Sequence, residues 1–172
     1  MPHREDIARL AAPGSIGVEL GVATGQFSRR LLETGRFSVL YSIDAWGDGR
    51  HNAVEMALAT AALAGYGAAS KIIRARFDQA VHQFDDGFFD FIYIDGYAHT
   101  GQENGQTLEE WWSKLKTGGV FAGDDYSRSW PHTIRAVDAF VEKHNLDLHI
   151  FKFDGPRDRV WDQSPSWYVI KP

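Results

Sequence analysis

The feature that most constrains the fold is a series of short apolar runs that alternate with helix-prone segments and end in glycine or an acidic residue. Such runs span residues 16–20, 37–43, 89–94 and 120–122. The run at 89–94 is almost entirely apolar, which is typical of a strand covered on both faces. Strands that alternate with helices predict right-handed crossovers and a mainly parallel sheet.

The segments between these runs have helical spacing. A short helix with Ile7, Leu10 and Ala11 is expected before the first strand, and an alanine-rich helix over 52–64 has Val54, Leu58 and Ala62 on a common face. Further helices are predicted from the following apolar patterns: Phe27, Leu31 and Leu32; Ala80, Val81 and Phe84; Leu108, Trp111, Trp112 and Leu115; Ile134, Val137, Phe140 and Val141.

The C-terminal part breaks the alternation. Strands are predicted over 148–153 and 167–170, and no helix lies between them, so they are expected to pair antiparallel. A further strand is predicted to open at Ile72 and Ile73. The predicted fold class is α/β, a Rossmann-like three-layer sandwich whose mainly parallel seven-stranded sheet has an antiparallel C-terminal strand.

Composition narrows the class of protein. The chain of 172 residues has no internal repeat or linker, so we expect a single domain over 1–172, with residues 1–15 as a short N-terminal helical segment. Its lack of cysteine excludes disulfides, thiolate nucleophiles and cysteine-ligated zinc. A net charge of −5 argues against a nucleic-acid partner. The absence of a long apolar run or a signal h-region predicts no membrane partner and a cytoplasmic location.

A glycine turn follows the first predicted strand, in the pattern Glu19-x-Gly21-x-x-x-Gly25. Glycine lets the backbone bend sharply and approach a ligand closely. The pattern lacks the central glycine of dinucleotide-binding turns, and its carboxylate would repel a pyrophosphate but suits the ammonium of an amino-acid moiety. The alternative is that the turn is glycine-rich for steric reasons alone.

The second strand ends in Asp44-Ala45-Trp46. Asp44 lies 25 residues after Glu19, near the ~20 expected for an acidic residue that accepts hydrogen bonds from ribose hydroxyls. Asp44 could instead cap the next turn. Trp46 could either stack on an adenine or fill the core. Together the two strand ends predict an adenosine-containing ligand.

Three further carboxylates end later strands: Asp95 follows one apolar run, and Asp124 and Asp125 follow the next. Neighbouring strands are ~4.8 Å apart, so these groups are expected to gather. Three carboxylates form a hard site that suits Mg²⁺, or Mn²⁺ or Ca²⁺ in its place. The alternative is that Asp95 and Asp124 cap turns and that Asp125 is solvated.

A histidine follows Asp95 by four residues. His99 is a candidate general base near neutral pH, although it could equally orient another group or be an ordinary loop residue. His51 and His132 are weaker candidates. The spacing of Trp111 and Trp112 favours helix packing over a substrate cage, whereas Tyr97, Tyr126 and Trp130 are candidates either for an acceptor pocket or for the core.

With these motifs in place, residues 16–170 resemble a class I S-adenosylmethionine-dependent methyltransferase, and most of all the small group that includes macrocin-type O-methyltransferases and cephalosporin-hydroxylase-like proteins. The resemblance implies O-methylation of a small-molecule hydroxyl. It places Glu19 and Gly21 at the methionine part of the cofactor, Asp44 at its ribose and Asp78 at the adenine loop, and it makes Asp95, Asp124 and Asp125 the divalent-metal ligands. Gly25, Ala45 and Trp46 in the same two turns are further predicted cofactor-binding residues. Asp95 is also predicted to bind the cofactor and, with His99, to act in catalysis.

Two features depart from this group. The histidine falls one residue later than in the usual Asp-Gly-x-His, and only about 15 residues precede the first strand. The short N-terminal segment predicts an open cleft or a lid from a second subunit, as in a homodimer. A nicotinamide-dependent oxidoreductase and a non-catalytic cofactor-binding protein on the same fold remain the alternatives.

Overall fold

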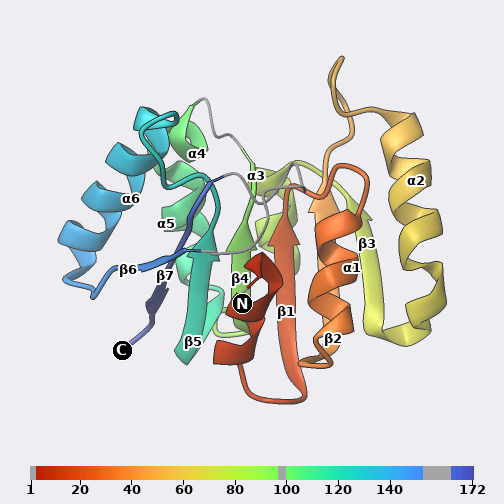
Figure 1. Ribbon diagram of the computed structural model, residues 1–172, viewed down its shortest axis with the longest axis horizontal. Helices are drawn as coiled ribbons and strands as arrows, with labels where there is room; N and C mark the ends of the chain where they lie inside the picture. The colour runs from red at the N-terminus through yellow and green to blue at the C-terminus, as the bar shows by residue number, and fades with distance from the viewer. Residues whose placement is uncertain (1–2, 97–99, 153–163) are drawn as a thin grey trace.

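The core of the molecule is a seven-stranded sheet with the order β3-β2-β1-β4-β5-β7-β6 (Figure 1). The computed structural model describes residues 3–96, 100–152 and 164–172. Its strands are β1 (Ser15–Leu20), β2 (Phe37–Asp44), β3 (Ser70–Arg74), β4 (Phe89–Ile94), β5 (Leu115–Gly123), β6 (His149–Phe151) and β7 (Ser166–Ile170). β1 to β5 are parallel, and β7 runs antiparallel to both β5 and β6. The predicted fold class and the antiparallel C-terminal pair are confirmed.

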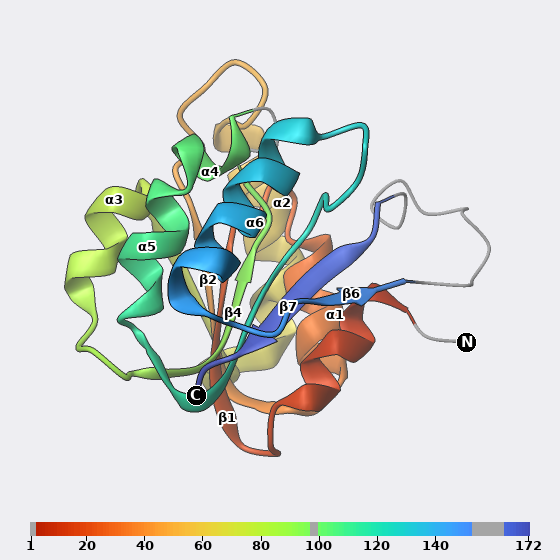
Figure 2. The same cartoon turned by 90° about the vertical axis from the view of Figure 1, so that its left-hand side faces the viewer.

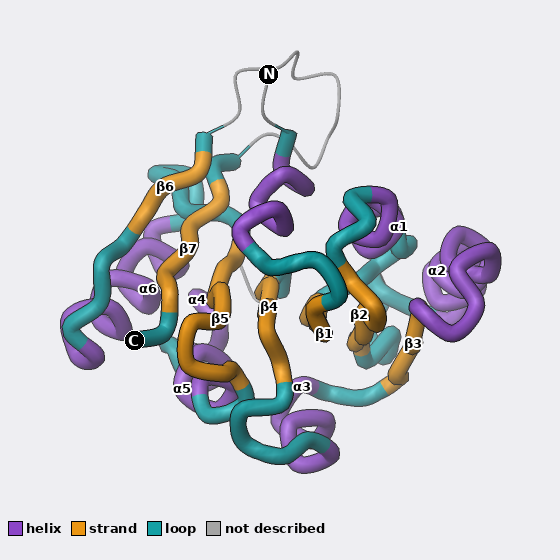
Figure 3. The backbone as a smooth tube through the Cα atoms, turned by 90° about the horizontal axis from the view of Figure 1, so that it is seen from below, coloured by secondary structure: helices purple, strands orange, loops and turns teal. Residues whose placement is uncertain are grey.

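Helices cover both faces of this sheet (Figures 2 and 3). One layer contains the 3₁₀ helix η1 (Arg4–Leu10), α1 (Gln26–Glu33) and α2 (Ala53–Leu63), and the other contains α3 (Phe77–Ala80), α5 (Gln106–Trp112) and α6 (Pro131–His144). The shorter elements are η2 (Ala64–Ala69), η3 (Val81–Gln83) and α4 (Gly101–Asn104). Among the described residues, no helix combines the length and the apolar character needed to cross a bilayer.

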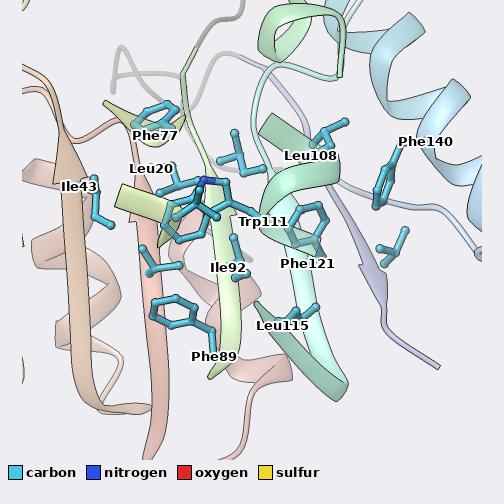
Figure 4. Close-up of a cluster of buried hydrophobic side chains, with 14 of the residues drawn as sticks. Leu20, Ile43, Phe77, Phe89, Ile92, Leu108, Trp111, Leu115, Phe121 and Phe140 are labelled. Atoms are coloured by element: carbon cyan, nitrogen blue, oxygen red, sulfur yellow. The ribbon is translucent and has the colours of Figure 1, made fainter. Parts of the chain in front are cut away.

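The larger apolar core lies between the sheet and the α3, α5 and α6 layer (Figure 4). Trp111 is fully buried there. Trp112 packs edge-on against Phe121 and Phe140, with ring centroids 5.4 Å and 5.2 Å away. The prediction that this tryptophan pair serves helix packing is therefore confirmed.

α2 differs from its predicted packing. The helix forms over nearly the expected range, but Val54 and Leu58 are 69% and 51% exposed. Ala59 and Leu63 face inward instead. The physical reason is position: α2 stands at the edge of its layer beside β3, where it has few neighbours and buries only a narrow stripe (Figure 1).

α4 is a left-handed turn rather than a conventional helix. Gly101, Gln102, Glu103 and Asn104 have φ values between 49° and 60°, a conformation that costs non-glycine residues roughly 1–2 kcal/mol each. The turn packs against α6 so closely that a Cβ on Gly101 would lie 2.3 Å from the carbonyl oxygen of His132. It follows Thr100, which lies beside the cleft described below.

The sheet topology sets the place of the site. Because β1 to β5 are parallel, their carboxyl ends meet at one edge, the upper edge in Figure 1. The strand order reverses between β1 and β4, which is the switch point where α/β sheets bind ligands. The acidic residues predicted to act together follow the strands at this edge.

Candidate functional site

A cleft of about 770 Å³ opens at the carboxyl edge of the sheet. This volume is in the range of ~300–1,000 Å³ usual for small-molecule sites. Seven of the predicted site residues line it: Glu19, Gly21, Asp44, Ala45, Asp95, Asp124 and Asp125. Side chains that lie far apart in the sequence thus share one pocket, as the strand pattern predicted.

The glycine turn after β1 is dictated by close contact with the end of β4. Gly21 has φ +95°, and a Cβ there would lie 2.1 Å from the carbonyl oxygen of Asp95. The Gly21 amide donates to the carbonyl of Ile43 on β2 at 2.9 Å. Gly25 (φ +78°) begins α1, and a Cβ on it would lie 2.9 Å from the Cα of Ala59 in α2. Both glycines therefore have steric reasons to be present.

Asp44 organises this turn through backbone amides. Its Oδ2 accepts hydrogen bonds from the amides of Val22 (2.9 Å) and Ala23 (3.0 Å), and its Oδ1 accepts from the amide of Trp46 (2.9 Å). The Trp46 ring is buried, and its Nε1 donates to the carbonyl of Ala23 at 2.8 Å. Of the two alternatives for Trp46, the structure places its ring in the core, whereas Asp44 faces the cleft.

Glu19 is a buried carboxyl group with one unused oxygen. The hydroxyl of Ser28 donates to Oε2, and Ser42 donates to the Ser28 oxygen at 2.9 Å. Oε1 has no hydrogen-bond partner among the described residues. Burial raises the pKa of Glu19 to about 8, although the hydrogen bond from Ser28 opposes the shift. A buried, unpaired acceptor beside a cleft is suited to a cationic ligand.

Asp95, Asp124 and Asp125, here called the acidic cluster, come together as predicted. One carboxylate oxygen from each lies within 4.8 Å of the others. Asp125 has a left-handed backbone (φ +59°), which is uncommon for a residue other than glycine. Burial raises the pKa of Asp124, and the charges of Asp95 and Asp125 add to the shift, whereas Arg4 opposes it.

Arg4 is the functional residue that was missed at the sequence level. This side chain, 1% exposed, reaches from η1 into the acidic cluster. Its Nη2 lies 2.5 Å from Asp95 Oδ2, and its Nη1 lies 3.3 Å from Asp124 Oδ2. The signal available was spacing, because Arg4 precedes Ile7 by three residues and Ala8 by four and so shares their buried helix face.

The remaining candidates are more scattered. Asp78 has a side chain that is 40% exposed, pairs with Arg76 at 3.1 Å, and does not line the cleft. Gly25 and Trp46 do not line the cleft, and His99 and Tyr97 lie outside the described residues. Of the other candidates for the acceptor pocket or the general base, Trp130 and His51 line the cleft. The Tyr126 hydroxyl instead donates to Asp138 at 2.7 Å on the surface.

Comparison with known proteins agrees with this geometry. A family model described as a methyltransferase domain matches residues 15–126, which is more than half of the chain. The chain belongs to this methyltransferase family. A comparison with curated proteins gave no match.

Solved structures share the methyltransferase fold at low sequence identity. An rRNA methylase from Streptococcus thermophilus is 17% identical with a TM-score of 0.65, covering 99% of this chain and 98% of that one. SMU.1697c from Streptococcus mutans, solved with S-adenosylhomocysteine, is 14% identical with a TM-score of 0.69 and full coverage of both chains. The O-methyltransferase TM0748 from Thermotoga maritima is 15% identical with a TM-score of 0.69, covering 99% of this chain and 66% of that one.

The resemblance to S-adenosylmethionine-dependent methyltransferases is thus confirmed at the level of fold and domain. At these identities the solved structures establish the fold alone. The narrower resemblance to the macrocin-type group stays a prediction.

Proposed function

We propose that this methyltransferase transfers a methyl group from S-adenosylmethionine to a hydroxyl group of a small molecule. One observation carries the proposal: the buried Glu19 carboxyl group, which shares a cleft with Asp44 and Asp95, has an oxygen with no hydrogen-bond partner in the described part of the chain. An unsatisfied buried acceptor is costly, so a bound donor there is favoured.

The described residues fit the cofactor. Glu19 would accept from the ammonium of the methionine part, because Oε1 is free and Ser28 already holds Oε2. Gly21 leaves the cleft floor without a side chain. Asp44 would accept from the ribose, since a carboxylate offers about four acceptor positions and three are used by backbone amides. When bound, the cofactor supplies the electrophilic methyl group on its sulfonium.

Asp95 is the group of this chain best placed to act on an acceptor hydroxyl. Its side chain is 28% exposed and lines the cleft, whereas that of Asp124 is 9% exposed. Arg4 holds one of its oxygens, which orients the other. We assign Asp95 the task of accepting the hydroxyl proton, and His99 is the second candidate for that task. Positioning of the hydroxyl against the cofactor would supply much of the rate enhancement.

The divalent ion predicted from the sequence does not fit the acidic cluster as it stands. Arg4 contacts Oδ2 of both Asp95 and Asp124, and the hydroxyl of Ser166 donates to Asp124 Oδ1 at 3.4 Å. Each oxygen of Asp124 therefore already has a partner, and a divalent ion bound to the cluster would share Asp95 and Asp124 with the Arg4 guanidinium. No step of the proposed reaction is assigned to Mg²⁺, Mn²⁺ or Ca²⁺.

A second acceptor class is worth a test because one structural neighbour is named as an rRNA methylase and matches this chain over nearly its whole length. The net charge of −5 disfavours RNA, since nucleic-acid binding normally needs a basic face. We therefore keep a small molecule as the proposed acceptor and no nucleic acid or membrane as partner.

The decisive experiment is calorimetry with S-adenosylhomocysteine on the wild-type chain and on Glu19→Ala. We expect wild-type binding and a loss of about tenfold or more in the variant, because the ammonium loses its acceptor. Ser38→Ala, on the exposed side of β2, is the matched control. Absence of wild-type binding at millimolar ligand would reject the cofactor assignment, and binding of NADH in a fluorescence titration would favour the oxidoreductase.

The acceptor is then sought by following S-adenosylhomocysteine release with a panel of sugars, phenols and small hydroxy acids, and with rRNA as the competing class. Turnover on a hydroxyl compound supports the proposal. Turnover on RNA alone contradicts the acceptor class, and cofactor binding without turnover on any member favours a non-catalytic role.

A further inference from the structure

We propose that Arg4 is the resident cation of the acidic cluster, taking the position between Asp95 and Asp124 that a divalent metal ion would otherwise occupy. Methyl transfer on this chain then proceeds without a bound metal. The inference deepens the proposed function and rests on it, because it concerns the same cleft.

The first support is the way one guanidinium spans two strand ends. β4 and β5 are paired in parallel, so Asp95 and Asp124 follow neighbouring strands. Nη2 of Arg4 contacts the first carboxylate and Nη1 the second, at 2.5 Å and 3.3 Å. The planar guanidinium can bridge two carboxylates in this way, whereas a single ammonium group acts as a point charge.

The second support is that the guanidinium is buried and has protein partners besides the two carboxylates. Nε donates to the Tyr93 hydroxyl at 2.7 Å, and the ring of Phe27 lies 4.0 Å from the guanidinium carbon. The Tyr93 hydroxyl in turn lies 2.6 Å from the Ser166 hydroxyl, which donates to Asp124. The network closes on itself, so Arg4 is built into the site rather than resting on it.

The third support is the anchoring of η1. Ile7 and Ala8 are fully buried in the core that also contains Phe27, Leu31 and Tyr93. Arg4 could leave the site only if this helix left the core or if its side chain gave up a buried ion pair. Removing one partner of a buried ion pair is strongly destabilising. Although burial alone would lower it, Asp124 and Asp95 raise the pKa of Arg4, which therefore stays charged.

The fourth support is competition for the same oxygens. A divalent ion binds carboxylate oxygen at about 2.0–2.6 Å. The Oδ2 atoms of Asp95 and Asp124 are already held by Arg4, so an ion bound to them would lie against a buried positive charge. Two like charges so close beside a buried side chain repel each other strongly. Arg4 and a metal ion are therefore alternatives.

The test is calorimetric titration of the metal-free full chain with MgCl₂ and with MnCl₂. We expect no saturable binding to wild type up to about 10 mM, and affinity at least about tenfold greater in Arg4→Met, which keeps an unbranched apolar stem beside Phe27 but removes the charge. Arg9→Met is the matched control, because Arg9 lies on the same helix with its side chain 58% exposed. Asp124→Asn added to Arg4→Met should abolish the gain.

A residue that only stabilised the fold would give no gain of metal affinity on removal. Saturable Mg²⁺ binding by wild type below about 1 mM, or an Arg4→Met variant that folds and gains nothing, would overturn the proposal. If Arg4→Met does not fold, methyl transfer by wild type after dialysis against EDTA decides: unchanged turnover supports Arg4, and turnover restored only by Mg²⁺ refutes it. Calorimetry with S-adenosylhomocysteine tests the proposed function separately, since it needs neither the variant nor the metal.

Discussion

The two halves of the cleft balance their negative charge in different ways. At the ends of β1 and β2, Asp44 is satisfied by amides of the turn that it organises, and Glu19 is held by Ser28 on the next helix. At the ends of β4 and β5, Asp95 and Asp124 are held by Arg4, which lies 91 residues from Asp95 along the chain. The contacts of the first half join residues that lie 9, 21 and 22 positions apart in the sequence, whereas the second half depends on a segment 91 residues away.

The two halves therefore differ in whether the protein itself supplies the positive charge that their carboxyl groups face. Glu19 lines the cleft, and its Oε1 has no partner within residues 3–96, 100–152 and 164–172, so the cofactor half is prepared for a cationic ligand. The acidic cluster already contains its cation. The two halves meet at Gly21, whose Cα faces the carbonyl of Asp95, and the following experiments separate their contributions.

The largest effect on stability is expected at Gly21, where the two halves of the cleft meet. Gly21→Ala places a Cβ 2.1 Å from the Asp95 carbonyl oxygen at φ +95°. Both backbone strain and overlap oppose folding, so we expect the free energy of unfolding in urea to fall by about 3 kcal/mol or more. The overlap forces β1 and β4 apart and should disturb both halves of the cleft.

Gly14→Ala is the control for strain alone, because Gly14 has φ +84° and no atom lies within 4 Å of the position that a Cβ would take there. It should cost only about 1 kcal/mol. Equal losses for the two variants would show that contact between the strand ends contributes nothing.

The substitution Glu19→Gln is expected to have an intermediate effect on the free energy of unfolding, and this effect depends on pH. The carboxyl has a pKa of about 8 in the folded chain against an ordinary value of 4.5, so the folded state binds this proton more tightly. Wild-type stability is therefore lost as pH rises from 4.5 to about 8. The variant lacks this loss, so its stability relative to wild type should rise over that interval by on the order of a few kcal/mol.

The measurement is urea unfolding of both chains from pH 5 to pH 9. Glu33→Gln, an exposed residue that pairs with Arg29 on α1, should show no such rise above pH 6. A difference between wild type and Glu19→Gln that does not change with pH would mean that the Glu19 carboxyl group is hydrated.

The smallest effect is expected from Asp78→Ala. Asp78 is exposed, and its pair with Arg76 is of the kind that contributes little, so the free energy of unfolding should stay within about 0.5 kcal/mol of wild type. Because Asp78 does not line the cleft, the affinity for S-adenosylhomocysteine should change by less than about twofold. A tenfold loss in calorimetry would instead support the role at the adenine that the family resemblance implies.

The elements of the fold were predicted well where a local pattern was strong. The apolar runs placed β1, β2 and β4 within one or two residues of their observed ends, and the missing helix before the last strand indicated its antiparallel pairing. The outward orientation of Val54 and Leu58 was not predicted, because helical spacing shows which residues share a face but not whether that face meets a neighbour.

The site, like the fold, has features that the sequence predicted and features that it did not. The convergence of Glu19, Asp44, Asp95 and Asp124 on one cleft was predicted, since parallel strands bring their carboxyl ends together. The hydrogen-bond and ion-pair partners of these carboxyl groups were not predicted. Asp44 binds amides of a turn whose geometry appears only in three dimensions, and Trp46 proved to be a core residue.

The sequence by itself determined which carboxyl groups would meet, because each of them ends an apolar run that is visible locally, and parallel strands bring their carboxyl ends to one edge of the sheet. Only the tertiary structure decided how their charge is balanced. Arg4 lies in a segment that precedes the first strand, and its place between Asp95 and Asp124 depends on how η1 packs over Phe27 and Tyr93. A contact between remote segments produces no periodic pattern in the sequence. A charge can be buried only where the fold supplies its partner, so the burial of Arg4 could not be predicted from its own segment.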